Sequence, residues 1–142
     1  PASAHTDTDS YVYFPVANVI ACGDTASLGN RYPTIDYANG GSLNGIIATV
    51  ETYIRMGDEQ TKYVPGHGPL ASKADMQKYH DMLVAVRDAV QGEIKAGKTE
   101  DQAVAAKPLT AIGKALGTNQ MLDDAMVRMS YRSLKGAKAN PA

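Results

Sequence analysis

The sequence predicts an α/β fold in which a small sheet of short strands carries flanking helices and leads into a helical C-terminal extension. Two runs of β-branched and aromatic residues, 11–15 and 18–22, lie close together near the start of the chain. From residue 43 onward, apolar residues recur at the spacing of one helix face. With 142 residues, of which 44% are hydrophobic, the chain is long enough and apolar enough for one domain with its own core.

The predicted sheet has three strands. Residues 11–15 and 18–22 read as a hairpin joined by a short turn. Residues 62–65 form a third short strand ahead of a Gly-His-Gly sequence. Residues 25–41 hold the glycine, proline and asparagine residues that are typical of a long irregular loop. A loop of this length inside a compact domain is usually functional or mobile.

Capping residues mark the two longest predicted helices. Ser42 is a good N-cap for the first helix, which we expect to end at residues 56–57. Ser72 and Asp75 form a variant capping box for the second helix. Its apolar stripe continues until Gly97, where we expect the helix to stop.

The C-terminal part of the chain predicts shorter helices. Thr99 with Gln102 caps a helix that we expect Pro108 to terminate. Gly113 and Gly117 are expected to lie in a looser connector. The last helix is expected to begin at Asn119, with its apolar residues in the core: Met121, Leu122, Met126 and Met129.

Helices that cover such a sheet on one side leave its other face open. About 25 cal/mol is lost for each Å² of apolar surface left in water. We therefore expect a partner to cover this face, either a missing N-terminal half or a second copy of the chain in a homo-oligomer.

Composition excludes several classes of protein. The formal net charge of −1 and the pI of about 6.3 are not those of a nucleic-acid binder. No apolar stretch approaches the roughly 20 residues that cross a bilayer, so we expect no membrane partner. The single cysteine, Cys22, excludes an internal disulfide framework and a four-cysteine zinc module.

Three candidate metal ligands, His5, Asp24 and His67, each lie at one end of a predicted strand. Imidazole nitrogen and carboxylate oxygen are ligands that zinc uses, and catalytic zinc sites leave one position open for water. Bound water has a pKa near 7, which supplies a hydroxide nucleophile at neutral pH. These residue types at strand ends therefore favour a hydrolytic metal site.

A structural interpretation of the same residues stays open, because long stretches of sequence separate them. His5 could be an exposed residue near the chain end, Asp24 could cap a turn, and His67 could belong to a tight loop. We expect His80, the third histidine, to be a surface or boundary residue. Residues 40–42 suit an anion site at a helix start, and a turn followed by an N-cap explains them equally well.

Four short sequence segments, taken in their order along the chain, resemble those of a known family. Residues 5–15, 18–24, 40–42 and 65–69 together resemble the C-terminal half of metallo-β-lactamase-fold hydrolases. The resemblance covers somewhat over half of the chain, about residues 4–83. The helical remainder is similar to the C-terminal extension of one branch of that superfamily.

This resemblance implies half of an αββα sandwich, with a site for one or two zinc ions at the edge of the sheets. His5 matches the family's ligand of the first metal, Asp24 the carboxylate that bridges two metals, and His67 the ligand of the second. We divide the chain into residues 1–97, the half-domain, and residues 98–142, the helical extension.

The sequence departs from the family's pattern in two ways. The family's His-x-His-x-Asp-His motif does not occur in these 142 residues. Cys22 stands where related sequences often have histidine; it could be a soft zinc ligand, but a small buried residue is favoured. Asp7 and Asp9 are expected to support His5 as second-shell partners, and Cys22 to lie near the ligands in the same way.

These observations predict a metal-dependent hydrolase whose chain is truncated here, with an incomplete zinc site that is weak or inactive alone. We assign no catalytic residue, and the expected substrate is a small molecule. The alternative is a non-catalytic interaction or oligomerisation module with vestigial ligands. The resemblance favours a periplasmic or secreted protein over a cytoplasmic one.

Overall fold

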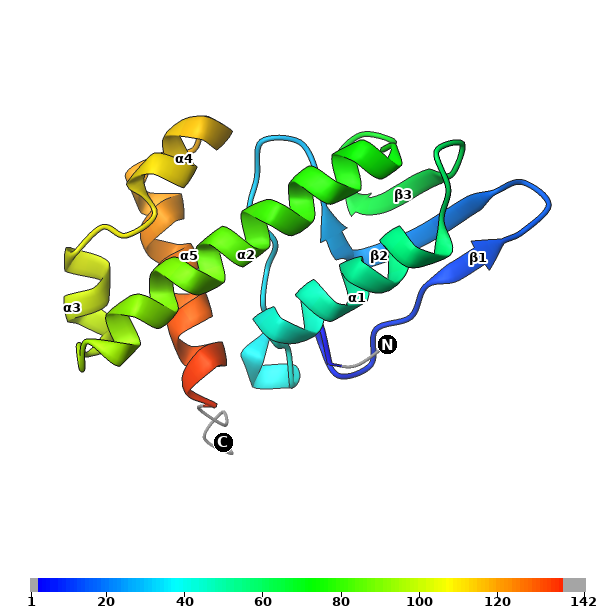
Figure 1. Ribbon diagram of the computed structural model, residues 1–142. Helices are drawn as coiled ribbons and strands as arrows, with labels where there is room; N and C mark the ends of the chain where they lie inside the picture. Colours follow the sequence, from blue (N-terminus) through cyan, green and yellow to red (C-terminus); the bar gives the residue numbers. More distant parts are fainter. Residues whose placement is uncertain (1–2, 137–142) are drawn as a thin grey trace.

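One face of a three-stranded sheet is covered by helices in the computed structural model, which describes residues 3–136 (Figure 1). The strands are β1 (Val12–Phe14), β2 (Val19–Ser27) and β3 (Lys62–His67), in the spatial order β1-β2-β3. β1 runs antiparallel to β2, and β3 runs parallel to it. The predicted α/β class, the hairpin and the third strand are confirmed.

The helices form a layer over the sheet and a bundle beside it. They are η1 (Tyr37–Asn39), α1 (Leu43–Met56), α2 (Lys73–Lys95), α3 (Glu100–Ala105), α4 (Thr110–Leu116) and α5 (Gln120–Lys135). α1 and α2 lie side by side, and α5 packs against both of them and against η1 (Figure 1). Within residues 3–136, no helix is long and apolar enough to cross a membrane.

The predicted helix starts are confirmed by their caps. The Ser42 hydroxyl accepts a hydrogen bond from the Gly45 amide at 3.2 Å at the start of α1. Full capping boxes begin α2, at Ser72, and α3, at Thr99. The Asn119 side chain accepts from the third residue after it at the start of α5. Local side-chain chemistry therefore places these four helices.

The predicted loop begins too early in the sequence. β2 does not stop at residue 22 but continues through Ser27, and its last three residues are buried. β3 runs beside this segment as far as the pairing of Ser27 with His67. The Thr25 hydroxyl also lies 2.6 Å from the phenolic oxygen of Tyr53 on α1. Small side chains and these partners hold the segment extended although its composition resembles a loop.

The predicted connector around Gly113 is instead the helix α4, and α3 ends at Ala105, three residues before Pro108. Gly113 is buried, and a Cβ at this position would collide with the carboxylate of Asp123 on α5. The glycine that made the segment look like a connector therefore serves close packing between two helices. Only Gly117, which ends α4 with φ 74°, acts as the sequence suggested.

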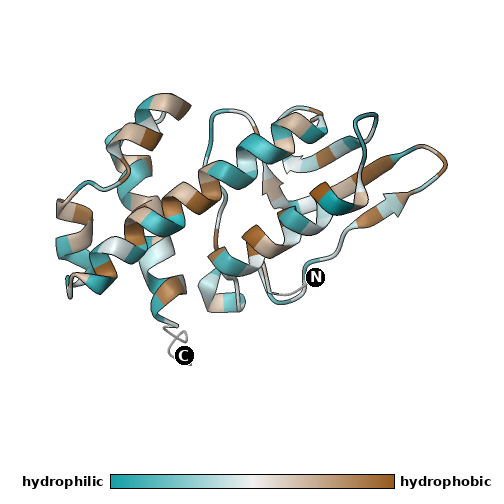
Figure 2. Cartoon of the chain, in the orientation of Figure 1, coloured by the Kyte–Doolittle hydropathy of each residue, from teal (hydrophilic) through white to brown (hydrophobic). Residues whose placement is uncertain are grey.

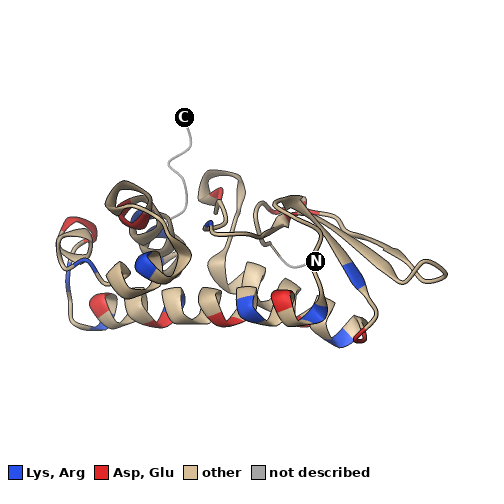
Figure 3. Cartoon of the chain, turned by 90° about the horizontal axis from the view of Figure 1, so that it is seen from above, with Lys and Arg blue, Asp and Glu red and all other residues tan. Residues whose placement is uncertain are grey.

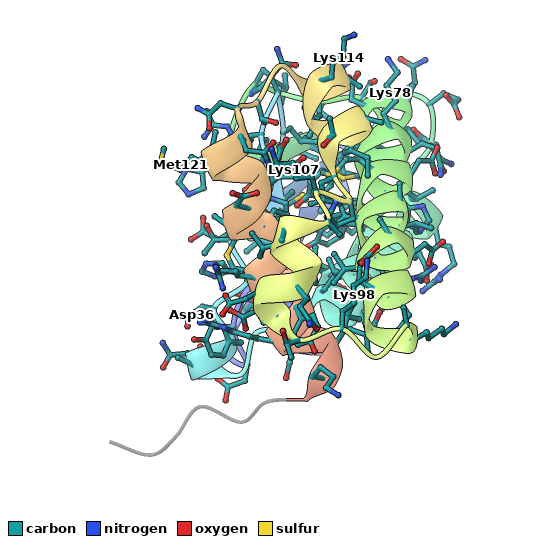
Figure 4. The ribbon with its side chains drawn as sticks, turned by 90° about the vertical axis from the view of Figure 1, so that its left-hand side faces the viewer. Asp36, Lys78, Lys98, Lys107, Lys114 and Met121 are labelled. Carbon is teal, nitrogen blue, oxygen red and sulfur yellow. The ribbon has the colours of Figure 1, made fainter. Side chains whose placement is uncertain are left out.

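The core prediction for α5 is half wrong. Met126 is fully buried and Met129 is half-buried, but Met121 and Leu122 are 73% and 47% exposed. Figure 4 shows Met121 projecting from the start of the helix. The buried positions of α5 follow a stripe with helical spacing: Asp123, Met126, Val127 and Ser130. Met121 and Leu122 fall outside that stripe.

The two faces of the sheet differ in their surroundings. Ile20 and Tyr63 are fully buried beneath the helices. Val12, Phe14 and Val64 are 51%, 49% and 42% exposed, and Val12 and Val64 flank the same β2 residue. We call these three residues the outer sheet face. The hairpin is largely hydrophobic (Figure 2) and carries no charged side chain along β1 (Figure 3).

Candidate metal centre

Asp24, at a break in the register of β2, meets His67, the last residue of the adjacent parallel strand β3. Asp24 Oδ1 lies 3.3 Å from His67 Nε2. Both side chains are about half exposed, at 48% and 58%. β2 and β3 are adjacent and parallel, and the half-exposed side chains of Asp24 and His67 reach a common space open to solvent.

A break in the strand register brings the two side chains together. Gly23 pairs with Pro65 and Ser27 pairs with His67, so the ladder shifts twice around Asp24. Such an irregularity redirects side chains and is common beside active sites. Gly66 makes room for the carboxylate, since a Cβ there would collide with Asp24 Oδ1 and the Gly23 backbone.

His5 lies on a loop that is fixed by its own contacts. Its Nδ1 atom is 3.6 Å from Asp9 Oδ1, and the two side chains are 21% and 10% exposed. The other Asp9 oxygen accepts a hydrogen bond from the Thr6 amide at 2.9 Å. The His5 carbonyl accepts from the Asp36 amide at 3.0 Å. Asp9 is thus placed to orient the imidazole, and its support of a metal-binding His5 stays a prediction.

The two other predicted supporting residues have different surroundings. Asp7 is exposed and lies against Gly40, while its amide donates to the Asn39 carbonyl at 2.9 Å. Cys22 is fully buried, and burial raises the pKa of its thiol to about 12. Its full burial fits the interpretation of Cys22 as a small buried residue.

Within residues 3–136, no three His, Cys, Asp or Glu side chains gather closely enough to hold one metal ion. The structure brings together Asp24 and His67 but leaves His5 with Asp9. Carboxylate oxygen and imidazole nitrogen are a donor pair that suits zinc. The pair can supply two ligands and leave the other positions to further donors and water.

Two open sequence interpretations are decided by the structure. The amide of Leu43, the first residue of α1, donates to Ser133 Oγ at 2.9 Å, and Ser42 caps the same turn. These bonds favour the N-cap interpretation of residues 40–42 over an anion site. His80 is 18% exposed and lies 3.2 Å from Glu51 on α1, which confirms a boundary position.

A cavity beside this edge of the sheet was missed by sequence reasoning. Its volume is about 340 Å³. Its lining comes from the loop after β2, the loop after β3, the start of α2 and the end of α4. No sequence motif joins these four segments, so only the folded chain reveals that they share a space.

The comparisons with known proteins point to the fold. No family model and no curated protein matches the chain. A double mutant of the sec-alkyl sulfatase PisA1 aligns with a TM-score of 0.67 and 14% identity, covering 98% of this chain and 24% of that one. The stereoselective inverting sec-alkylsulfatase Pisa1 from Pseudomonas sp. aligns with a TM-score of 0.64 and 13% identity, covering 99% and 25%.

The chain thus spans about a quarter of the length of these sulfatase structures. PisA1 is a metallo-β-lactamase-fold enzyme, and the likeness extends over nearly all of this chain. At this level of identity the comparison shows a shared fold. The predicted half of a metallo-β-lactamase fold is supported at that coarse level.

Proposed function

We propose that this chain supplies metal ligands to a metal-dependent hydrolase of the metallo-β-lactamase superfamily. The observation that carries the proposal is the approach of Asp24 to His67 at 3.3 Å, on adjacent strands of a fold that resembles this superfamily. The two residues lie far apart in the sequence, and they are not paired in the register of β2 and β3.

The roles of the residues follow from their atoms. Asp24 offers carboxylate oxygens and His67 offers Nε2 to the shared space at the sheet edge. His5 is proposed as a ligand from the neighbouring loop, with Asp9 holding its ring through Nδ1. A zinc ion bound there would lower the pKa of a coordinated water to about 7, which is the chemistry hydrolysis needs.

We propose that the chain alone is weak or inactive, because its donors are too few. Catalytic zinc sites use three protein ligands for each ion, whereas the pair at the sheet edge gives two. The whole sequence holds three histidines, and His80 is engaged between α1 and α2. Further donors are proposed to come from an N-terminal half of the fold or from a second copy.

The outer sheet face supports such a partner. All-parallel sheets occur almost only with both faces covered, whereas antiparallel sheets can leave one face to water. β2 and β3 are parallel, yet Phe14 and Val64 are about half exposed on the face away from the helices. A partner that covers this face would also stand beside the edge where Asp24 and His67 meet.

Zinc titration followed by the NMR signals of the histidine rings tests the proposal. We expect saturable shifts at His67 and a loss of those shifts in Asp24→Asn. His80→Ala is the matched control, and it should leave the His67 response unchanged. An unchanged His67 ring at every zinc concentration would refute a metal role for this residue.

The competing function is a non-catalytic module that kept the fold for association. The absence of a three-ligand group among residues 3–136 and the exposed outer sheet face favour it. Mixing a His5→Ala chain with an Asp24→Ala chain separates the two ideas. Recovery of zinc-dependent hydrolysis in the mixture indicates a site assembled across copies. Association of the wild-type chain together with a His67 ring that does not respond to zinc indicates the module.

A further inference from the structure

The cavity beside the candidate metal centre has the size and walls of a small-molecule site. Its volume of about 340 Å³ falls within the usual range of about 300–1,000 Å³. Its apolar walls come from both loops and from the helices: Leu28, Pro69, Leu70, Tyr79, Met82 and Leu116. Leu70 is 62% exposed there, so its side chain is available to a ligand in the cavity.

Strand pairing connects this cavity to the metal centre. Ser27 lines the cavity and is the β2 partner of His67. The next residue, Leu28, donates its amide to the His67 carbonyl at 2.9 Å. A ligand in the cavity therefore lies beside the strand segment that carries His67, the neighbour of Asp24.

The charges around the cavity are predominantly positive. Arg31 and Lys78 line it together with a single carboxylate, Asp75. Asp75 is occupied at the start of α2, where one of its oxygens accepts from the amide and hydroxyl of Ser72 at 3.0 and 2.7 Å. Its other oxygen is 3.9 Å from Lys78, a long and exposed contact that neutralises little of the lysine's charge.

We propose that this cavity binds a small amphiphilic anion, with the alkyl part against the apolar walls and the anionic group toward Arg31 and Lys78. The identification of this ligand as the substrate rests on the hydrolase function proposed above. Apolar walls alone would accept a neutral or cationic alkyl chain equally well, so the two cations decide the class. Lys78 projects from α2 into solvent in Figure 4, within reach of an incoming anion.

Titration calorimetry of the full chain with octanoate, in the presence of a metal chelator, tests the cavity separately from the zinc site. We expect saturable binding that weakens about fourfold in Leu70→Ser, the loss expected for roughly one buried methylene. The double change Arg31→Gln with Lys78→Gln should weaken binding about fivefold, as for a moderate exposed ion pair. Octyltrimethylammonium should not displace octanoate.

Two variants serve as controls. Lys95→Gln removes one positive charge from the other end of α2 and should leave binding unchanged. Val64→Ser should also leave it unchanged, because Val64 lies on the outer sheet face. Absence of octanoate binding, or loss of binding in Val64→Ser but not in Leu70→Ser, would overturn the proposal. Because the titration contains no free metal, its failure is distinct from failure of His67 to respond to zinc.

Discussion

The packing of α4 against α5 depends on one buried carboxylate, that of Asp123. Asp123 on α5 is 6% exposed and accepts hydrogen bonds from Tyr32 at 3.0 Å and Thr118 at 2.6 Å. Its carboxylate faces Gly113 of α4 so closely that a methyl group at Gly113 would collide with it. A buried carboxylate held by two hydroxyl groups is costly to displace.

Replacing Gly113 with alanine should therefore destabilise the protein by about 1–3 kcal/mol, the usual cost of overpacking. The free energy of unfolding, measured with urea, checks this. Gly92→Ala is the matched control, since nothing lies within 4 Å of the added methyl group on α2. That control should gain about 0.5–1 kcal/mol from the higher helix propensity of alanine. Equal effects of the two changes would contradict the packing argument.

Sequence reasoning could name the types of the candidate ligands but not their distances. Asp24 and His67 each follow a predicted strand and have glycine beside them. His5 precedes a predicted strand, in a segment that resembles the family's His-Thr motif. The approach of Asp24 to His67 depends on a register shift in β2 and on the missing side chain of Gly66. Both are properties of paired strands, which no single segment of sequence contains.

At the scale of elements, an ion-pair cluster joins α3 to α5 and η1. Glu100 on α3 accepts hydrogen bonds from Arg132 at 2.7 and 2.8 Å and from Arg128 at 2.9 Å. Arg132 also donates to the Tyr37 hydroxyl at 2.7 Å. The bonds from Arg132, followed by those from Arg128, lower the pKa of Glu100 below its usual value.

Because the folded pKa of Glu100 lies below the unfolded one, its stabilisation is present above the usual pKa, about 4.3, and is lost as the pH falls through the folded value. Glu100→Gln should therefore flatten the decline of the unfolding midpoint between about pH 5 and the acid limit. Thermal unfolding at a series of pH values checks this. Glu59→Gln changes an exposed loop carboxylate and should keep the wild-type pH profile.

Elements with local signals were predicted well, and elements that depend on distant partners were not. Caps at Ser42, Ser72, Thr99 and Asn119 placed four helix starts, because a cap is made by residues within one turn. The end of β2 and the helix α4 were missed. Both depend on tertiary contacts. The end of β2 contacts Tyr53, and α4 packs closely against Asp123.

For the molecule as a whole, the unequal faces of the sheet are the feature with the widest consequence. The inner face is sealed by α1 and α2, whereas the outer sheet face presents Val12, Phe14 and Val64 to water. We propose that a partner covers this apolar face in the working protein. The sequence predicted this face from the number of strands and the helices available to cover them.

Val64→Ser should weaken self-association or binding of a complementing chain, because it places a hydroxyl in the middle of the outer sheet face. Val16→Ser, at the fully exposed tip of the hairpin, is the matched control. Sedimentation velocity over a range of concentrations checks association. Stability of the single chain should change by less than about 1 kcal/mol in either variant, since both side chains are exposed. Equal association of both variants with wild type would show that this face is not the interface.

In the proposed function, Asp24 and His67 bind the same divalent cation. Crystals grown with zinc, measured at the zinc absorption edge, test it most directly. We predict an anomalous peak about 2.0–2.2 Å from both a carboxylate oxygen of Asp24 and Nε2 of His67. Zinc found only at other residues, with these two side chains unliganded at saturating metal, would contradict the account.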